Sequence, residues 1–155
     1  MATSDGFTKV SWVTTISNTA APTTTELNNG VALDGYVIPD GLDMGWEDST
    51  YNTSVLNTTY ETEAVGRVKL APKVTMLSDL KSDTAWTTFA SNPSGYLVVR
   101  RGVANATAYT SGQKLEVVPC QARVRKPAAT AMNEATKMTV DFVVTGAPVN
   151  PSTIA

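Results

Sequence analysis

The feature that most constrains the fold is a two-residue alternation of apolar and polar side chains over residues 67–77. One phase of this segment holds the residues Val68, Leu70, Pro72, Val74 and Met76, and the other phase is basic or polar. Side chains of a β-strand point alternately to opposite faces, so this period indicates a strand with one buried face. We predict one long strand here, with an edge position or a bulge at Pro72, because proline donates no hydrogen bond to a ladder.

Other segments carry the same signal. Residues 8–16 and 136–145 alternate in the same way, and residues 96–100 form a short apolar run. Residues 113–126 also alternate, but their apolar phase changes at Val118-Pro119, which predicts a bulge or a bend. The frequent threonine and valine residues suit a pleated surface better than a helix, because β-branched side chains are stiff.

Helix signals are few. Ser82 or Asp83 is a suitable N-cap for a helix that carries Trp86 and Phe89 and ends at the Asn-Pro-Ser-Gly of residues 92–95. A proline and a glycine also bound a short helical turn within residues 21–30. We therefore predict a mainly β protein: a β-sandwich or rolled antiparallel sheet with one flanking α-helix.

Length and cysteine content limit the organisation further. The 155 residues suit a single domain over residues 1–155, which we expect to carry a long loop at 45–63 and a flexible or partner-bound arm at 146–155. Cys120 is the only cysteine, so an intrachain disulfide is impossible. The first residues lack the pattern of a secretory signal, and we expect folding in a cytoplasm without membrane insertion.

The composition argues against catalysis. The chain has no histidine, which excludes Ser-His-Asp triads, Cys-His pairs and histidine-ligated metals. Asp40, Asp43, Glu47 and Asp48 lie close in sequence but do not match a calcium-binding loop. No glycine-rich phosphate loop lies between a strand and a helix. We expect no catalytic residue, no metal and no cofactor.

Residues 45–63 are the strongest candidate for an interaction site. The segment is polar, acidic and without a clear period, and loops of this length are usually functional or disordered. Its aromatic residues argue against simple disorder. Either the loop packs on its own domain or it meets a partner, and we expect the second, a stacking contact made by Trp46, Glu47, Asp48, Tyr51, Leu56 and Tyr60.

Charge is unevenly distributed along the chain. Residues 1–63 hold nine acidic residues and one lysine, whereas residues 64–155 hold five acidic and eleven basic residues. Either acidic loops cover basic strands within one chain, or the acidic face of one subunit meets the basic face of the next. The second arrangement suits head-to-tail assembly, with an inter-subunit role for Arg100, Arg101, Arg123 and Arg125.

Several stretches resemble one protein family in order and spacing. They are Thr8-Lys-Val-Ser-Trp-Val, Ile38-Pro-Asp-Gly-Leu, Gly95-Tyr-Leu-Val-Val-Arg-Arg-Gly102 and Ser111-Gly-Gln-Lys-Leu-Glu-Val-Val-Pro119. Together they are similar to the major tail tube proteins of long-tailed, non-contractile bacteriophages, especially those that infect actinobacteria. The likeness covers nearly the whole chain, although none of these motifs is diagnostic alone.

The resemblance implies a structural virion protein that assembles with itself. In this family, rings that are usually hexameric stack into a hollow tube, which encloses the tape-measure protein and later conducts the genome. The implied partners are ring neighbours, stacked rings, the tape-measure protein, and the tail tip and tail terminator proteins, while DNA passes without specific binding. The alternative is a monomeric β-sandwich for carbohydrate binding or host adhesion, with Trp46, Tyr51 and Tyr60 as an aromatic platform.

Overall fold

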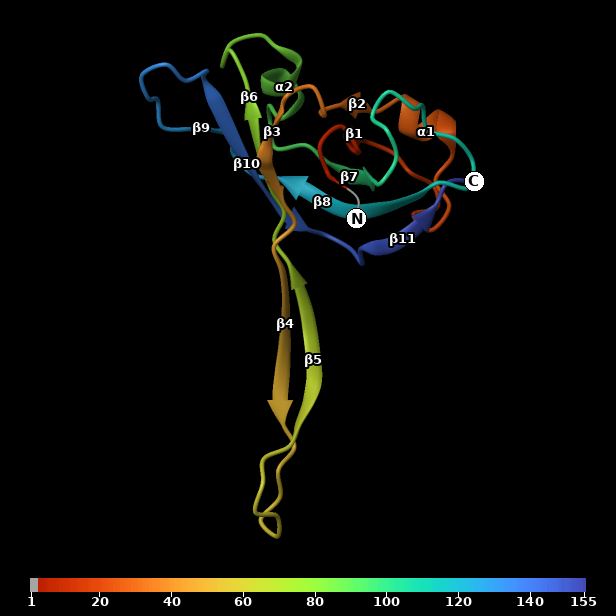
Figure 1. The fold of residues 1–155 in the computed structure, drawn as a ribbon, viewed down its shortest axis with the longest axis vertical. Helices are drawn as coiled ribbons and strands as arrows, with labels where there is room; N and C mark the ends of the chain where they lie inside the picture. The colour runs from red at the N-terminus through yellow and green to blue at the C-terminus, as the bar shows by residue number, and fades with distance from the viewer. Residues whose placement is uncertain (1–2) are drawn as a thin grey trace.

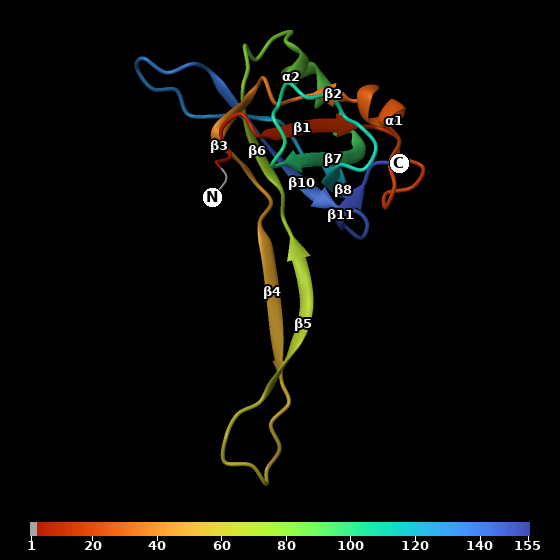
Figure 2. The same cartoon turned by 45° about the vertical axis from the view of Figure 1, so that its right-hand side comes forward.

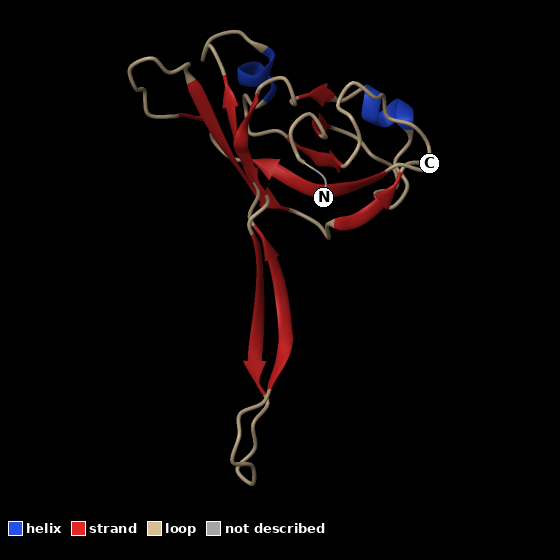
Figure 3. Ribbon diagram, in the orientation of Figure 1, coloured by secondary structure: helices blue, strands red, loops and turns tan. Residues whose placement is uncertain are grey.

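The computed structural model describes residues 3–155, which form a curled antiparallel sheet with a long two-stranded hairpin that projects from it (Figures 1 and 3). The strands in the described residues are β1 (Thr8–Val13), β2 (Val31–Ala32), β3 (Val37–Asp43), β4 (Trp46–Asn52), β5 (Glu63–Leu70), β6 (Lys73–Leu77), β7 (Ser94–Arg101), β8 (Lys114–Ala122), β9 (Lys126–Pro127), β10 (Lys137–Val144) and β11 (Val149–Thr153). The helices are α1 (Thr24–Asn28) and α2 (Thr84–Thr88). The predicted fold class, mainly β with a rolled antiparallel sheet, is confirmed.

The main sheet has the order β2-β1-β7-β8-β10-β6-β3, with β11 also beside β8 and β9 also beside β10. Strands β4 and β5 pair only with each other. Strand β3 continues into β4, and β5 continues into β6, so the projecting hairpin is the extension of two neighbouring strands of the sheet (Figure 2).

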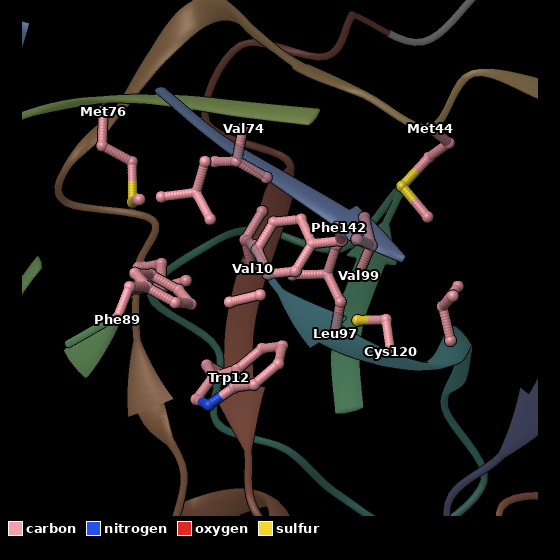
Figure 4. Packing of buried hydrophobic residues seen from close by; sticks show 14 of the residues in the cluster. Val10, Trp12, Met44, Val74, Met76, Phe89, Leu97, Val99, Cys120 and Phe142 are labelled. Atoms are coloured by element: carbon pink, nitrogen blue, oxygen red, sulfur yellow. The ribbon is translucent and has the colours of Figure 1, made fainter. Parts of the chain in front are cut away.

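The centre of the sheet is buried on both faces. Trp12, Phe89 and Phe142 form the heart of the larger core cluster, with ring centroids 5.4–5.7 Å apart (Figure 4). Val98 of β7 belongs to a second cluster on the other face, which also contains Leu27 of α1. Successive residues of β7 therefore enter two different cores, because side chains alternate between the faces of a strand.

Both predicted helical segments are confirmed, and their caps explain where they begin. The side chain of Asp83 accepts a hydrogen bond from the backbone N–H of Trp86 at 3.1 Å, which caps α2. Thr23 and Glu26 form a reciprocal capping box at the start of α1. Among the described residues, neither helix approaches the length or apolar character needed to cross a membrane.

Two predicted strands differ from the structure. Residues 67–77 are not one strand, because Ala71 and Pro72 separate β5 in the hairpin from β6 in the sheet. Of the bulge or bend predicted at Val118-Pro119, the bulge is absent from the pairing with β7, since β8 pairs with β7 in continuous register through these residues. The change of apolar phase in β8 arises because Val117 and Val118 each enter one of the two cores.

The C-terminal segment is also different from the flexible or partner-bound arm expected at 146–155. Strand β11 pairs with β8, and Ile154 is buried in the second core. The hydroxyl of Ser152 donates to the backbone carbonyl of Thr19 at 2.7 Å. The glycine and prolines of this segment suggested an irregular chain, but an edge strand tolerates proline where its register shifts, as it does between Val149 and Ser152.

Candidate assembly interface

The hairpin arm, defined here as residues 46–70, is the most exposed part of the described chain. Every residue of β4 is exposed, and no part of the main sheet pairs with either strand of the arm (Figure 1). Seven of the twelve exposed large hydrophobic side chains in residues 3–155 lie on it: Trp46, Tyr51, Val55, Leu56, Tyr60, Val65 and Val68. An isolated two-stranded hairpin is only marginally stable in water, so this concentration of uncovered apolar surface indicates a partner.

The expectation of an irregular loop at 45–63 was therefore wrong in part. Residues 46–52 form a strand, whose pairing with β5 includes Trp46 opposite Leu70 and Asn52 opposite Glu63. The alternative that this segment covers its own domain is not what the structure shows, because the arm points away from the sheet (Figure 2). The strand was not predicted because both of its faces meet solvent. Its sequence therefore lacks the alternation of apolar and polar residues that a buried face produces.

The tip of the arm, residues 53–62, is shaped by polar contacts. The backbone N–H of Thr53 donates to the carbonyl of Thr62 at 2.8 Å, and their hydroxyl oxygens lie 2.9 Å apart. Leu56 is fully exposed, and Tyr60 is 68% exposed. The hydrogen bonds thus hold a turn that presents apolar side chains to solvent.

Each face of the arm carries both apolar and charged side chains. Residues that pair across strands share a face, so Trp46, Val65 and Val68 lie on one face. The other face carries Glu47 opposite Lys69. Asp48 lies on the first face opposite Val68, and Tyr51 lies on the second opposite Ala64, so both faces offer apolar and charged groups to a second protein surface.

A tight joint attaches the arm to the sheet. Gly45 has φ +60°, and its N–H donates to the side chain of Asp43 at 2.9 Å. On the other strand, the buried Pro72 accepts a hydrogen bond from the N–H of Phe142 at 2.9 Å. A methyl group added at Gly45 would lie 2.5 Å from the carbonyl oxygen of Ala71. The joint therefore requires glycine, and it fixes the direction in which the arm leaves the sheet.

The arginines expected at a subunit contact lie in different environments. Arg100 is completely buried, and its guanidinium donates to the carbonyls of Ala104, Thr107 and Ala108 and to the side chain of Gln113. This burial contradicts a direct contact between Arg100 and a neighbouring subunit. The side chain instead supports the loop at residues 102–113 from inside, where carbonyl oxygens accept its hydrogen bonds.

Arg101 and Arg125 are engaged within the chain but remain near the surface. Arg101 pairs with Glu116 at 2.6 Å, and its side chain is about half exposed. Arg125 stacks on Trp86 with its guanidinium 3.8 Å from the ring centroid, and donates to the carbonyl of Trp86. Arg123 is exposed and forms no ion pair among residues 3–155.

Ion pairing within the described chain does not join the acidic and basic parts of the sequence. The three ion pairs found in residues 3–155 are Arg101–Glu116, Lys126–Asp141 and Lys137–Glu134. All six residues follow residue 63, so the acids of the arm pair with none of these bases. The charge asymmetry is thus left available for contacts between subunits.

Sequence reasoning missed three features of this surface. Val68 was expected in the core, but the arm carries it into solvent. Val65 was not identified, and neither was the joint at Gly45. The sequence offered one usable signal, a glycine and a proline at residues 45 and 72, each of which interrupts one of the two paired strands.

Comparisons with known proteins identify the family and the fold. A family model described as phage tail tube protein matches residues 1–155. No match was found among curated proteins. Among solved structures, the chain is similar to one in the cryo-EM structure of the anti-feeding prophage (AFP) baseplate, 6-fold symmetrised, with 9% sequence identity, 97% of each chain covered and a TM-score of 0.56.

Proposed function

This chain belongs to the phage tail tube proteins, and we propose that its copies close into hexameric rings, which stack into the hollow tube of a long-tailed, non-contractile phage. The hairpin arm is the observation that carries this proposal. It extends a paired backbone and seven large apolar side chains beyond the fold that produces it. Exposed apolar surface of this extent is typical of a contact site, and in a tube a second subunit would cover it.

Ring closure is supported by the edges of the sheet. The main sheet ends at β2 and β3, and each of these strands has one partner in the described chain. Pairing between neighbouring subunits removes open edges, as closure does in a barrel. The similar chain comes from an assembly described as 6-fold symmetrised, which favours six subunits in the ring proposed here.

Stacking is assigned to the arm. From Trp46 to Leu56 the arm spans at most about 33 Å, at about 3.3 Å per residue. That reach is enough for the tip to lie beside a subunit of the adjacent ring. Trp46, Tyr51, Leu56 and Tyr60 would supply apolar contacts, while Glu47 and Asp48 would meet basic side chains of the neighbour.

The other proposed partners are the proteins that contact the inside and the two ends of a tail tube. The tape-measure protein lies inside during assembly, and the tail tip and tail terminator proteins bind the two ends. Genome DNA later passes through the lumen without specific binding. The protein acts structurally, without a catalytic step or cofactor, in a virion tail that is assembled in the host cytoplasm.

The direct test is assembly of the purified protein. Negative-stain microscopy and sedimentation should detect rings or tubes as the protein concentration rises. Short tube fragments should be added as seeds, so that the assay does not depend on the initiation of new tubes. Monomers at every concentration, salt and pH, even with seeds present, would contradict the proposal and favour the monomeric binding module.

A further inference from the structure

A groove of about 770 Å³ lies where the hairpin arm joins the sheet. Val68 and Leu70 of the arm line one part, and Phe142, Val143 and Val144 of β10 line another. Val143 is 51% exposed, although it lies beside the buried core residue Phe142. The groove therefore offers an apolar floor that nothing in residues 3–155 fills.

The rim of the groove is charged, with a surplus of basic residues. Arg67, Lys69 and Arg123 line it together with Glu47 and Asp48. None of the three bases forms an ion pair within the described chain. An occupant with exposed apolar side chains and negative charge would fit this surface.

We propose that the tip of the hairpin arm of a second copy of this chain occupies the groove. This proposal rests on the stacking role given to the arm above, and it names the surface that receives the tip. The tip, residues 53–62, offers Val55, Leu56 and Tyr60, together with Glu61 and no basic residue. Its composition therefore complements an apolar groove with basic residues at the rim.

Dimensions favour this receiving site over the opposite end of the subunit. From Lys137 to Val144, strand β10 spans about 23 Å at about 3.3 Å per residue, which is less than the reach of about 33 Å estimated for the arm. The Val144 end of β10 lies next to the base of the arm, and the loop that carries Met132 lies at the other end (Figure 1). An arm that runs along a stacked subunit thus passes the whole of β10 and brings its tip to the groove.

The test is disulfide crosslinking between chains that each carry one introduced cysteine. It is possible because the native Cys120 does not interfere. Cys120 is fully buried, and burial raises the pKa of its thiol to about 12. Tubes are grown under reducing conditions from an equal mixture of Leu56→Cys chains and Val143→Cys chains, then oxidised. The matched control mixes Leu56→Cys chains with Met132→Cys chains, since Met132 is exposed at the other end of β10.

Disulfide-linked dimers should form in the first mixture at least tenfold more than in the control. Maleimide labelling of Val143→Cys should likewise be at least tenfold slower in tubes than in free subunits. Tubes that give no 56–143 linkage, or that link 56 to 132 instead, would overturn the proposed groove while leaving arm-dependent stacking in place. If Leu56→Cys blocks tube growth, Tyr60→Cys replaces it, with the same criteria for both outcomes.

Discussion

At the scale of single residues, Arg100 and Arg101 are adjacent in the sequence but lie in different environments. Arg100 has 0% exposure and four hydrogen-bond acceptors, three of them backbone carbonyls, whereas Arg101 forms one partly exposed ion pair. A buried acceptor left without a donor costs much more than the loss of a solvated ion pair. The sequence Arg-Arg, read without a fold, gives both the same role.

Replacing each arginine in turn should separate these roles. Arg100→Met should lower the free energy of unfolding by about 2–4 kcal/mol, because several buried acceptors lose their donor. Arg101→Met, the matched control, should change it by less than about 1 kcal/mol. Urea titration followed by tryptophan fluorescence measures both. Equal effects from the two substitutions would contradict the structural role of Arg100.

At the scale of elements, strands with a buried face were predictable and strands without one were not. The alternation at residues 136–145 marked β10, because Met138, Val140 and Phe142 all enter the core. Strand β4 has no buried face, so its identity comes from pairing with β5, a contact that local sequence does not record. The segment singled out from the sequence, residues 45–63, is exposed in the structure, but its shape, an arm instead of a loop, depends on that pairing.

The joint between arm and sheet gives a test at this scale. Gly45→Ala should cost about 1–2 kcal/mol for a left-handed backbone alone, and the clash with the carbonyl of Ala71 should also turn the arm. We therefore expect sharply reduced tube yield in sedimentation assays, with the sheet still folded by circular dichroism. Gly6→Ala is the control, because Gly6 also has positive φ but open space around it. Similar tube yields from both variants would show that the joint does not set the direction of the arm.

At the scale of the whole molecule, charge is separated along the chain and not neutralised within it. Acids of the arm have no ion-pair partner in residues 3–155, and Arg123 has none either. A subunit of this kind has a polar surface, negative at the far end of the arm, where Glu61 and Glu63 lie, and with a surplus of basic residues around its base. The proposed head-to-tail stacking would bring such surfaces together between successive rings.

Salt should therefore weaken stacking. The Debye length falls from about 10 Å at 0.1 M to about 3 Å at 1 M ionic strength, so the lowest concentration that supports tube growth should rise several-fold over this range of NaCl. Arg123→Glu should raise that concentration at low salt and reduce its salt dependence, while Arg123→Lys, which keeps the charge, should not. Light scattering measures the threshold. A threshold independent of salt, or unaffected by Arg123→Glu, would show that the charge separation does not contribute to assembly.

Whether the arm stacks the rings is decided by shortening the arm. Residues 53–62 are replaced by Asn-Gly, which closes a two-residue hairpin between Asn52 and Glu63, the last residue pair of the arm. The change removes Leu56 and Tyr60, each worth about 2 kcal/mol when buried against a neighbour, while Met132→Ser serves as an exposed control outside the arm. Negative-stain microscopy should show that the shortened protein folds and closes into rings but forms no tubes, whereas the control forms tubes normally. Tubes of normal length from the shortened protein would show that the arm does not stack the rings.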